Sequence, residues 1–535
     1  MNPVHPMQHD NPHPDPGTDG LHDRIQAWAR MRPRAEAAVE PGRRLTYAAL
    51  RDAIDACAAG MMAAGVQRSD RVATLAVPGL DFLVTFLATA AIGGIWVGLN
   101  PRYTEPELDA VIARIEPRLV FAPAAIGVRS YRQWMAALPA SISVIDLLDA
   151  AASADASQGM PFAAFVASGK SIGRAQREKR YAETRAADPC LIVFTSGSTG
   201  VPKGAMISHA ALVGASTVQL RIWPAHPLRV LDNLPINHIG CVGDLCCYAL
   251  VGGGTVVFTP SFDPDASLAA IRDEQVTVWG QVPTMFQLTL DAPGFDLTLL
   301  ASLQRIFWGG AHAPPQLVAR LRRFAPRIAT SYSQTETVGS VTFTPANAGL
   351  ALLQQTVGRA VDPYQVRIAD AEGRSLQSGE DGEVQVRTPF GMTGYWRDPQ
   401  ATAAATTTDG WQRTGDIGTL TPEGDLRLLG RVHDVFKSGG YNIYPPEIEA
   451  ALATHPGVDQ VAVVGFPDPL YGSVAVAFVV ATASAPSVEA LRAHLRERLA
   501  NYKIPKRFIF VDALPRLAVG KVDKRALQAQ AGATP

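Results

Sequence analysis

The chain has 535 residues, of which 47% are hydrophobic and 18% are charged, a balance typical of a globular protein with large buried sheets. Its formal net charge of −1 gives no electrostatic reason to expect nucleic acid or an anionic membrane surface as a partner. The five cysteines are odd in number and lack C-x-x-C spacing, so we interpret them as reduced core thiols of a cytoplasmic protein.

Residues 1–20 are rich in Pro, His and Asp and contain no apolar core, which predicts a disordered tail and not a signal peptide. The apolar run 241–258 contains Asp244 and a triple glycine, which predicts a buried helix followed by a strand and no transmembrane segment. Strand-like and helix-like segments alternate along most of the chain, which predicts an α/β fold with largely parallel sheets. Strands are expected at residues 71–77, 189–194, 255–258, 276–279 and 305–308, and helices at residues 82–92 and 264–273.

The pattern changes towards the C-terminus. Residues 382–387 alternate with period two, which predicts a smaller β-rich unit. Further on, the sequence predicts strands at 458–464 and 474–480 and an amphipathic helix at 488–499. We therefore divide the chain into the tail, an N-terminal α/β core of residues 21–356, a β-rich subdomain of residues 357–430, and a small α/β C-terminal domain of residues 431–535.

A run rich in glycine and hydroxyl residues, FTSGSTGVPKGA at residues 194–205, follows an apolar strand. Glycine frees backbone N–H groups to bind an anion, and hydroxyls and a lysine add further donors. The Gly-Lys-Ser/Thr triplet of a P-loop NTPase is missing, so that class is disfavoured. The remaining interpretations are a flexible surface loop or a phosphate loop formed by Thr195, Ser196, Gly197, Ser198, Thr199, Gly200 and Lys203.

Residues 194–204 resemble the phosphate loop of the adenylate-forming (AMP-binding) superfamily, which includes acyl-CoA synthetases, peptide-synthetase adenylation domains and luciferases. Other motifs similar to those of this superfamily follow in the family order, and the resemblance covers about residues 20–527. Ser333 departs from the pattern, because the family usually has Gly there. The other motifs lie at residues 234–240, 308–314, 332–336, 411–416, 430–449, 502–505 and 515–524.

The resemblance implies an enzyme that activates a carboxylic acid with ATP and then acylates coenzyme A (CoA). A carboxylate is a poor electrophile, whereas its attack on the α-phosphate of ATP releases pyrophosphate and gives an acyl-adenylate with a good leaving group. The resemblance implies Glu336 as the Mg²⁺ ligand, Thr335 as a donor to the α-phosphate and Lys521 as the cation at the carboxylate. It assigns the rest of the nucleotide site to Gly310, Ala311, Ser331, Tyr332, Ser333, Gln334, Asp416 and Arg431, the last two at the ribose.

In this superfamily the C-terminal domain rotates between the two half-reactions, which implies a mobile domain here. The hinge position is His433, where family members usually have Asp or Lys. After the rotation, Lys437 would approach the adenylate. The pantetheine of CoA would lie against Ser438, Gly439 and Gly440, because glycine permits close backbone approach.

The acid is expected beside His238, which the resemblance identifies as a gate and catalytic residue. The segment around it contains no carboxylate to pair with an amino group, and the expected pocket residues are apolar or small, which favours a fatty or aromatic acid. Gly309 and Gly310 have two interpretations: a turn that needs unusual φ values, or space left for the acyl group beside the adenylate.

Several alternatives share these motifs. A free carrier protein could replace CoA as acceptor, a luciferase-like oxidase would carry the same residues, and a non-catalytic sensor could bind the adenylate or acyl group. The intact set of catalytic residues argues against the sensor. We also include as partners a second copy of the chain, in a homodimer, and a lysine acetyltransferase acting on Lys521, since acetylation would remove the charge that adenylation needs.

Overall fold

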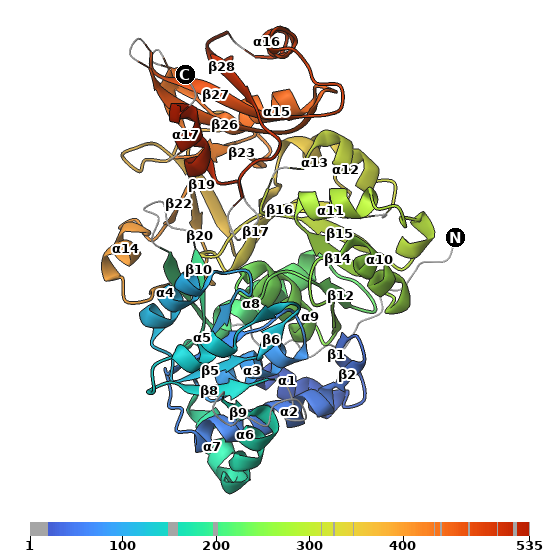
Figure 1. The fold of residues 1–535 in the computed structure, drawn as a ribbon, viewed down its shortest axis with the longest axis vertical. Helices are drawn as coiled ribbons and strands as arrows, with labels where there is room; N and C mark the ends of the chain where they lie inside the picture. Colours follow the sequence, from blue (N-terminus) through green and yellow to red (C-terminus); the bar gives the residue numbers. More distant parts are fainter. Residues whose placement is uncertain are drawn as a thin grey trace.

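The computed structural model describes residues 20–147, 159–195, 202–311, 313–324, 327–345, 347–432, 434–438, 441–468, 471–499, 501–516 and 522–533. The predicted tail, apart from Gly20, lies outside these residues. Two large sheets with their helices form the lower and middle parts of the molecule, and a smaller C-terminal unit lies at the top of Figure 1. The predicted α/β fold with a large N-terminal and a small C-terminal part is therefore confirmed.

The first large sheet has nine strands. In spatial order they are β18 (Arg359–Ala360), β17 (Gly339–Phe343), β16 (Ile328–Gln334), β15 (Arg305–Trp308), β14 (Val278–Gln281), β12 (Arg229–Asp232), β13 (Thr255–Phe258), β1 (Glu36–Glu40) and β2 (Arg43–Thr46). The strands from β16 to β1 run parallel, and helical crossovers join the consecutive ones. Antiparallel pairs close both edges, β16–β17–β18 at one and β1–β2 at the other.

The second large sheet has eight strands. In spatial order they are β21 (Gly394–Tyr395), β11 (Lys203–Ser208), β10 (Pro189–Thr195), β4 (Ile95–Leu99), β3 (Arg71–Leu75), β5 (Leu119–Ala122), β8 (Ser143–Asp146) and β9 (Met160–Pro161). The strands from β10 to β9 run parallel, and β11 and β21 add an antiparallel edge. β4 is buried along its whole length, as expected for a parallel strand covered on both faces.

Two smaller sheets form the C-terminal third of the chain. An antiparallel sheet contains β19 (Gln365–Ala369), β20 (Gly382–Arg387), β22 (Gln412–Leu420) and β23 (Leu426–Arg431). The C-terminal sheet contains β25 (Tyr441–Ile443), β24 (Phe436–Ser438), β27 (Gly472–Ala481), β26 (Val458–Asp468) and β28 (Arg507–Phe510). A short hairpin joins β6 (Ala125–Ile126) to β7 (Arg129–Ser130).

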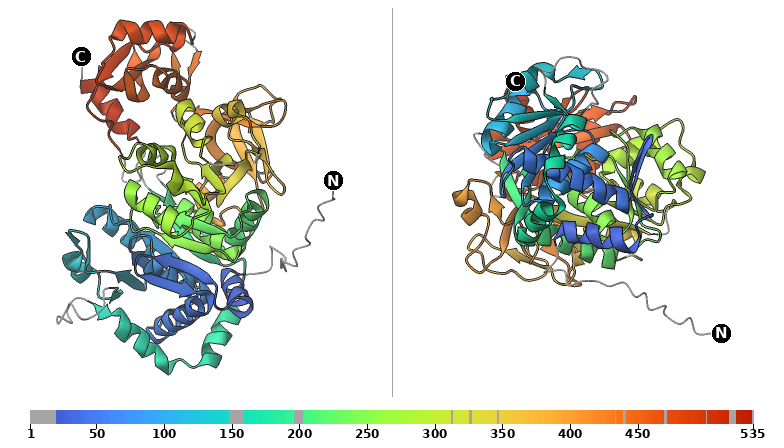
Figure 2. Two further views of the ribbon diagram at one scale, coloured as in Figure 1. Left: turned by 90° about the vertical axis from the view of Figure 1, so that its right-hand side faces the viewer. Right: turned by 90° about the horizontal axis from the view of Figure 1, so that it is seen from below.

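Helices cover the sheets and connect their parallel strands, as the two further views in Figure 2 show. The α-helices are α1 (Leu21–Met31), α2 (Tyr47–Ala63), α3 (Leu80–Ala91), α4 (Glu105–Ile115), α5 (Arg132–Ala137), α6 (Phe162–Ser168), α7 (Arg174–Glu183), α8 (His209–Ile222), α9 (Tyr248–Val251), α10 (Pro264–Asp273), α11 (Pro283–Leu290), α12 (Pro315–Leu321), α13 (Leu350–Gln355), α14 (Pro399–Ala404), α15 (Pro445–Ala453), α16 (Val488–Arg496) and α17 (Lys524–Ala533). The other helical segments are the 3₁₀ turns η3 (Gly169–Ser171), η5 (Leu297–Leu300) and η6 (Asn501–Lys503) and the π-helix η4 (Gly240–Cys247).

Helix α3 joins the two large sheets. All of its residues except Asp81 are buried, as expected for a helix that is apolar on every side. The Phe82 ring lies 5.9 Å from the ring of Trp96 in β4 and 5.6 Å from that of Phe258 in β13. One aromatic side chain thus contacts both sheets and fixes their relative position.

The predicted elements are present with small shifts at their ends. The strand predicted at 276–279 is β14, which begins two residues later, and the helix predicted at 488–499 is α16, which ends at Arg496. The apolar run 241–258 forms η4, α9 and β13, the predicted helix followed by a strand. Among the described helices, none has the length and hydropathy that crossing a bilayer requires.

Candidate active site

The two ends of the glycine-rich loop lie side by side. β10 ends at Thr195 and β11 begins at Lys203, and these two residues are register partners in an antiparallel pair. The predicted phosphate contacts Ser196, Gly197, Ser198, Thr199 and Gly200 lie outside the described residues. The strand pairing therefore places the entry and exit of the loop at one edge of the eight-stranded sheet.

Glu336, the predicted metal ligand, lies where the two large sheets meet. Its Oε1 atom accepts hydrogen bonds from Thr195 Oγ1 at 3.3 Å and from the Tyr395 hydroxyl at 2.9 Å. The ammonium of Lys203 lies 5.4 Å from the centre of the Tyr395 ring. Burial, and then the Glu336 charge, raise the pKa of the Tyr395 hydroxyl, so that hydroxyl stays a donor. The carboxylate and these donors fit a site for a hard divalent cation beside phosphates.

The turn that carries Glu336 is held by a buried threonine. Gln334 N donates to Thr337 Oγ1 at 3.1 Å, and Thr337 Oγ1 is 2.8 Å from the Gly339 carbonyl oxygen. Val338 in this turn has φ +59°, which is strained for a β-branched residue. The turn thus fixes the backbone of Thr335 and Glu336 between β16 and β17.

Asp416, the predicted ribose ligand, is held from three sides. Its Oδ2 atom accepts from the Tyr332 hydroxyl at 2.5 Å and from Gln334 Nε2 at 2.7 Å. Its Oδ1 atom is 2.9 Å from Arg431 Nε, because Asp416 and Arg431 are cross-strand partners in β22 and β23. Burial, and then Asp416, raise the pKa of Tyr332, which keeps that hydroxyl protonated. Four predicted nucleotide residues are thereby brought together.

The segment with the predicted gate residue His238 crosses β4 at close range. A Cβ added to Gly98 would lie 2.6 Å from the Ile236 carbonyl oxygen, so the backbone of this segment approaches β4 as closely as glycine allows. Asn237 Nδ2 donates to the Tyr103 hydroxyl at 3.1 Å, and His238 N donates to the Pro235 carbonyl at 3.0 Å. His238 is left half-buried.

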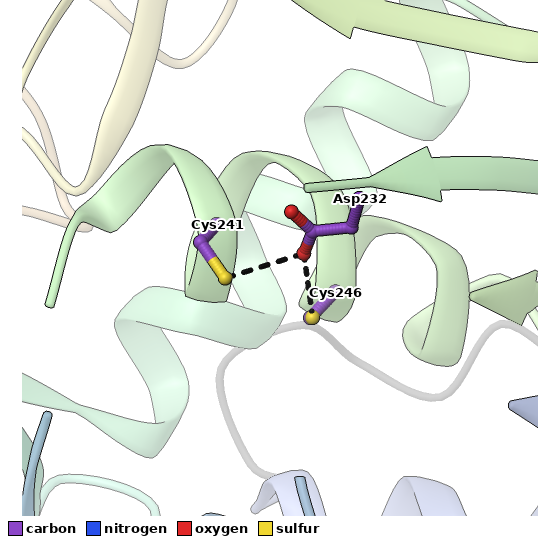
Figure 3. A group of neighbouring side chains, drawn as sticks. All are labelled: Asp232, Cys241 and Cys246. Atoms are coloured by element: carbon purple, nitrogen blue, oxygen red, sulfur yellow. Dashed lines mark hydrogen bonds between the residues drawn. The ribbon is translucent and has the colours of Figure 1, made fainter. Parts of the chain in front are cut away.

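A buried carboxylate anchors both ends of this segment (Figure 3). Asp232, the last residue of β12, accepts from Leu234 N at 3.1 Å and from the thiols of Cys246 at 3.0 Å and Cys241 at 3.3 Å. Cys241 and Cys246 are five residues apart in η4, and the i to i+5 spacing of a π-helix points both to the same side. Burial raises the pKa of both thiols, so they act as donors.

Gly309 and Gly310, the two adjacent glycines after β15, differ in backbone conformation and in surroundings. Gly310 has φ +76°, and a Cβ there would meet Val282 Cγ1 at 3.8 Å. The backbone conformation at Gly310 therefore favours glycine, although a side chain there would have free space around it. Gly309 does not have a positive φ, and a Cβ there would lie 3.7 Å from Ser331 Oγ and 3.8 Å from Ser333 Oγ. The positive φ fits the turn interpretation at Gly310, and space left for the acyl group at Gly309 stays a prediction.

The C-terminal residues of the predicted site are described in part. Lys437 and Ser438 lie in β24, where Ser438 is buried and pairs with Gly472 of β27. The side chain of Lys437 and all of His433, Gly439, Gly440 and Lys521 lie outside the described residues. Gly310 and Ala311 are exposed at the end of β15, and Ser331 is buried.

Tyr395 is the functional candidate that the sequence did not indicate. It reaches Glu336 because β21 pairs with β11, with Tyr395 opposite Ala205. No motif or period connects a tyrosine with a glutamate 59 positions earlier. The Gly394-Tyr395-Trp396 run after a turn is the one local signal, and it is weak.

The comparisons with known proteins show the family to which the chain belongs. The family model of the AMP-binding enzyme matches residues 25–396, and that of the AMP-binding enzyme C-terminal domain matches residues 447–521. Because the first match covers more than half of the chain, this chain belongs to the AMP-binding enzyme family. The resemblance seen in the motifs is thereby confirmed.

The similarity extends over nearly the whole length. A feruloyl-CoA synthase from Amycolatopsis sp is 36% identical over 509 residues, which cover 94% of this chain and 97% of that protein. An indoleacetate–CoA ligase from Aromatoleum aromaticum is 34% identical over 519 residues, 94% of this chain and 96% of that one. The crystal structure of ATP-bound MatB from Rhodopseudomonas palustris has a TM-score of 0.80 at 28% identity and covers 95% of this chain and 98% of that chain.

Tyr395→Phe tests the cation site. The change removes the hydroxyl that donates to Glu336 and keeps the ring beside Lys203. A hydrogen bond to a charged group contributes about 1.5–3 kcal/mol, so we expect the affinity for ATP with Mg²⁺, measured by titration calorimetry, to fall about tenfold or more. Tyr471→Phe, at a hydroxyl on the exposed surface, is the control. Unchanged affinity in folded Tyr395→Phe would contradict this role.

Asp232→Asn tests the anchor of the gate segment. Burial raises the pKa of Asp232 to about 7, whereas an unfolded Asp titrates near about 3.9. The folded state therefore binds the proton more tightly, and its stability should fall as pH rises from about 4 to about 7.

The free energy of unfolding is measured by urea unfolding at several pH values. We expect it to fall in the wild type as pH rises, and to fall less in Asp232→Asn. Asp52→Asn, at an exposed site, should follow the wild-type profile. Parallel profiles for the wild type and Asp232→Asn would contradict the assignment.

Proposed function

We propose that this chain is an ATP-dependent acyl-CoA synthetase, which forms acyl-AMP from a carboxylic acid, releases pyrophosphate, and passes the acyl group to the thiol of CoA. The observation that carries the proposal is the convergence of Glu336, Thr195 and Lys203 at the junction of the two large sheets. The relatives that match over nearly the whole chain are CoA ligases by name, which supports the same reaction.

In the first half-reaction the chain binds and orients ATP. Lys203 and the loop before it would hold the phosphates, and Thr335 would donate to the α-phosphate. Asp416, held by Arg431 and Tyr332, would accept the ribose hydroxyls through its carboxylate. Bringing the acid and ATP together in this way replaces an encounter in solution by a positioned reaction.

The metal and the acid complete this step. Glu336 would hold Mg²⁺, which supplies positive charge to the phosphates when it is bound. His238 would line the entry of the acid, and Lys521 would approach from the C-terminal domain to the carboxylate. The nucleotide base would lie against the segment of Gly309, Gly310 and Ala311.

In the second half-reaction, we propose that the C-terminal domain, residues 431–535, rotates about His433 against the core of residues 21–356 and the subdomain of residues 357–430. Lys437 would then replace Lys521, and Ser438, Gly439 and Gly440 would face the pantetheine. The separate C-terminal sheet, with its own buried core, supports this division. The homodimer and the acetylation of Lys521 stay predictions from the sequence.

The proposed acid is fatty or ring-bearing. A Cβ added to Gly310 would meet Val282 Cγ1, so Val282 borders the open place there. Val242, which follows His238 in the chain, and Val341 of β17 are apolar and buried. The relatives named for feruloyl-CoA and indoleacetate support a ring-bearing acid. A free carrier protein is the alternative acceptor, and a non-catalytic sensor is the alternative from another class.

Acid-dependent ATP–pyrophosphate exchange across a panel of fatty and aromatic acids, followed by thioester formation with CoA, tests the proposal. Exchange followed by a CoA thioester is the expected result. Exchange without a CoA thioester would point to a carrier protein as acceptor. Binding of acyl-AMP without exchange for any acid would favour the sensor and overturn the proposal.

Lys521→Ala and Lys437→Ala separate the two half-reactions. Lys521→Ala should abolish adenylate formation and spare thioester formation from supplied acyl-AMP, because its charge is needed only in the first step. Lys437→Ala should do the reverse, less completely. Lys506→Ala, elsewhere in the C-terminal domain, is the control. Equal loss of both half-reactions in both variants would contradict the rotation.

Gly309→Leu and Gly310→Ala separate the space and turn interpretations. A side chain at Gly309 would project towards Ser331 and Ser333, so Gly309→Leu should lower kcat/KM about tenfold or more for ring-bearing acids and little for acetate. Gly310→Ala strains a positive φ in open space and should affect all acids alike. Uniform loss across acids in folded Gly309→Leu would contradict the pocket at this position.

A further inference from the structure

A small enclosed cavity lies on the far side of the predicted acid site. It is lined by Ser216 and Gln219 of α8, Asp244 of η4, and Val338 and Ser340 at β17. Its volume of about 10 Å³ has room for one water-sized group. Helix α8 and strand β17 are close to one another in the centre of Figure 1, and both contact η4. The remaining lining residues are Leu212, Ala215 and Gly243, so the small cavity has both polar and apolar walls.

Asp244 is the charged residue of this lining. A Cβ added to Gly339 would lie 2.4 Å from Asp244 Oδ1, so the carboxyl group packs directly on the backbone of β17. Burial raises the pKa of Asp244 to about 7, and a hydrogen bond from the Ser340 backbone lowers it in part. In the described parts of the chain no basic side chain forms an ion pair with Asp244. Asp244 is half-buried, and its carboxyl group can accept a further hydrogen bond beside that from the Ser340 backbone.

Tyr364 carries a further polar group close to Asp244. The hydroxyl of Tyr364 is buried and makes no hydrogen bond among the described residues. Burial raises the pKa of Tyr364, and the negative charge of Asp244 raises it further. The two groups are therefore close enough to interact electrostatically. Gln219 Nε2 donates to the Asp244 backbone carbonyl at 3.1 Å, which fixes the side chain of Gln219 at the cavity.

The cavity borders the space at Gly309 through two serines. Ser331 Oγ is 3.7 Å from the position of a Cβ on Gly309, and it is 2.9 Å from Ser340 Oγ. Ser340 in turn lines the cavity. At the other end, η4 carries Asp244 and begins two residues after His238. We take this line, from Gly309 past Ser331 and Ser340 to Asp244, as the direction of an acid whose carboxylate lies at the nucleotide.

The strained Val338 supports a built site. Its φ of +59° is unfavourable for a β-branched residue, and such strain persists where the surroundings fix the backbone. Val338 lines the cavity, and Glu336, two residues earlier, is the proposed metal ligand. One turn thus positions both the cation site and the cavity wall.

We propose that this cavity is a subsite for a hydroxyl group at the far end of the acid, with Asp244 as the acceptor of its hydrogen bond. The inference rests on the proposed function, because it assumes that the acid lies beside Gly309. A hydroxyl fits the volume, adds a donor to the one that the Ser340 backbone gives Asp244, and is small enough to lie between Gln219 and Ser340. A substrate without this group leaves Asp244 with the backbone donor alone, and a site built to bind a hydroxyl discriminates against such a substrate.

The experiment compares matched acids that differ only by the distal hydroxyl. One pair is 4-hydroxycinnamate and cinnamate, and a second is an ω-hydroxy fatty acid and its parent fatty acid. The measured quantity is kcat/KM in acid-dependent ATP–pyrophosphate exchange. For the wild type we expect at least a tenfold preference for the hydroxylated member of one pair.

Two variants of Asp244 test its role. Asp244→Leu should lose the preference, by a fall for the hydroxylated acid and no fall for its partner. Asp244→Asn retains an acceptor oxygen and should keep part of the preference, which also covers the case in which Asp244→Leu does not fold. Asp146→Asn is the matched control, because Asp146 is a buried carboxylate that accepts from Ala124 N in the other sheet.

The outcomes distinguish this inference from the function on which it rests. If exchange occurs but the wild type prefers neither member of either pair, the subsite is overturned and the synthetase stands. The same holds if folded Asp244→Leu and Asp244→Asn both keep the wild-type preference. If no acid supports exchange at all, the proposed function fails, and the subsite fails with it.

Discussion

The packing of both large sheets on the buried helix α3 determines where a site can form. Phe82 contacts Trp96 in one sheet and Phe258 in the other, and burial of these rings contributes roughly 25 cal/mol per Å² of apolar surface. A shift of one sheet against the other would expose that surface. Because this packing fixes the position of one sheet relative to the other, the Thr195 hydroxyl at the end of β10 can donate a hydrogen bond of 3.3 Å to Glu336, in the turn between β16 and β17.

Three carboxylates in this region, two of them buried and that of Asp244 half-buried, are stabilised in different ways. Asp416, the proposed ribose ligand, has a guanidinium, a phenol and an amide as partners, so its charge is compensated. Asp232 receives two thiol donors and a backbone N–H, which suit an anchor for the gate segment. Asp244 has a backbone donor and an adjoining cavity. The least compensated of the three is the one best placed to recognise a ligand.

Many elements could be predicted because their signals are local. β13, β15, β20 and α10 have the bounds that alternation, apolar runs and a proline at the helix start indicate. The ends of β14 and α16 were less predictable, because a terminal residue joins an element only when its backbone partner is in place. The π-helical form of η4 had no sequence signal, since the same apolar run fits an α-helix.

The sequence by itself determined the class of enzyme and predicted the residues of the nucleotide site. Those residues lie in short motifs, because a phosphate loop or a turn such as Gln334–Gly339 depends on neighbours in the chain. The tertiary structure alone decided that Tyr395 reaches Glu336, that Cys241 and Cys246 share one oxygen of Asp232, and that Asp244 borders a cavity. These contacts join segments that only strand pairing and sheet packing bring together, and no periodicity in the chain encodes such a meeting.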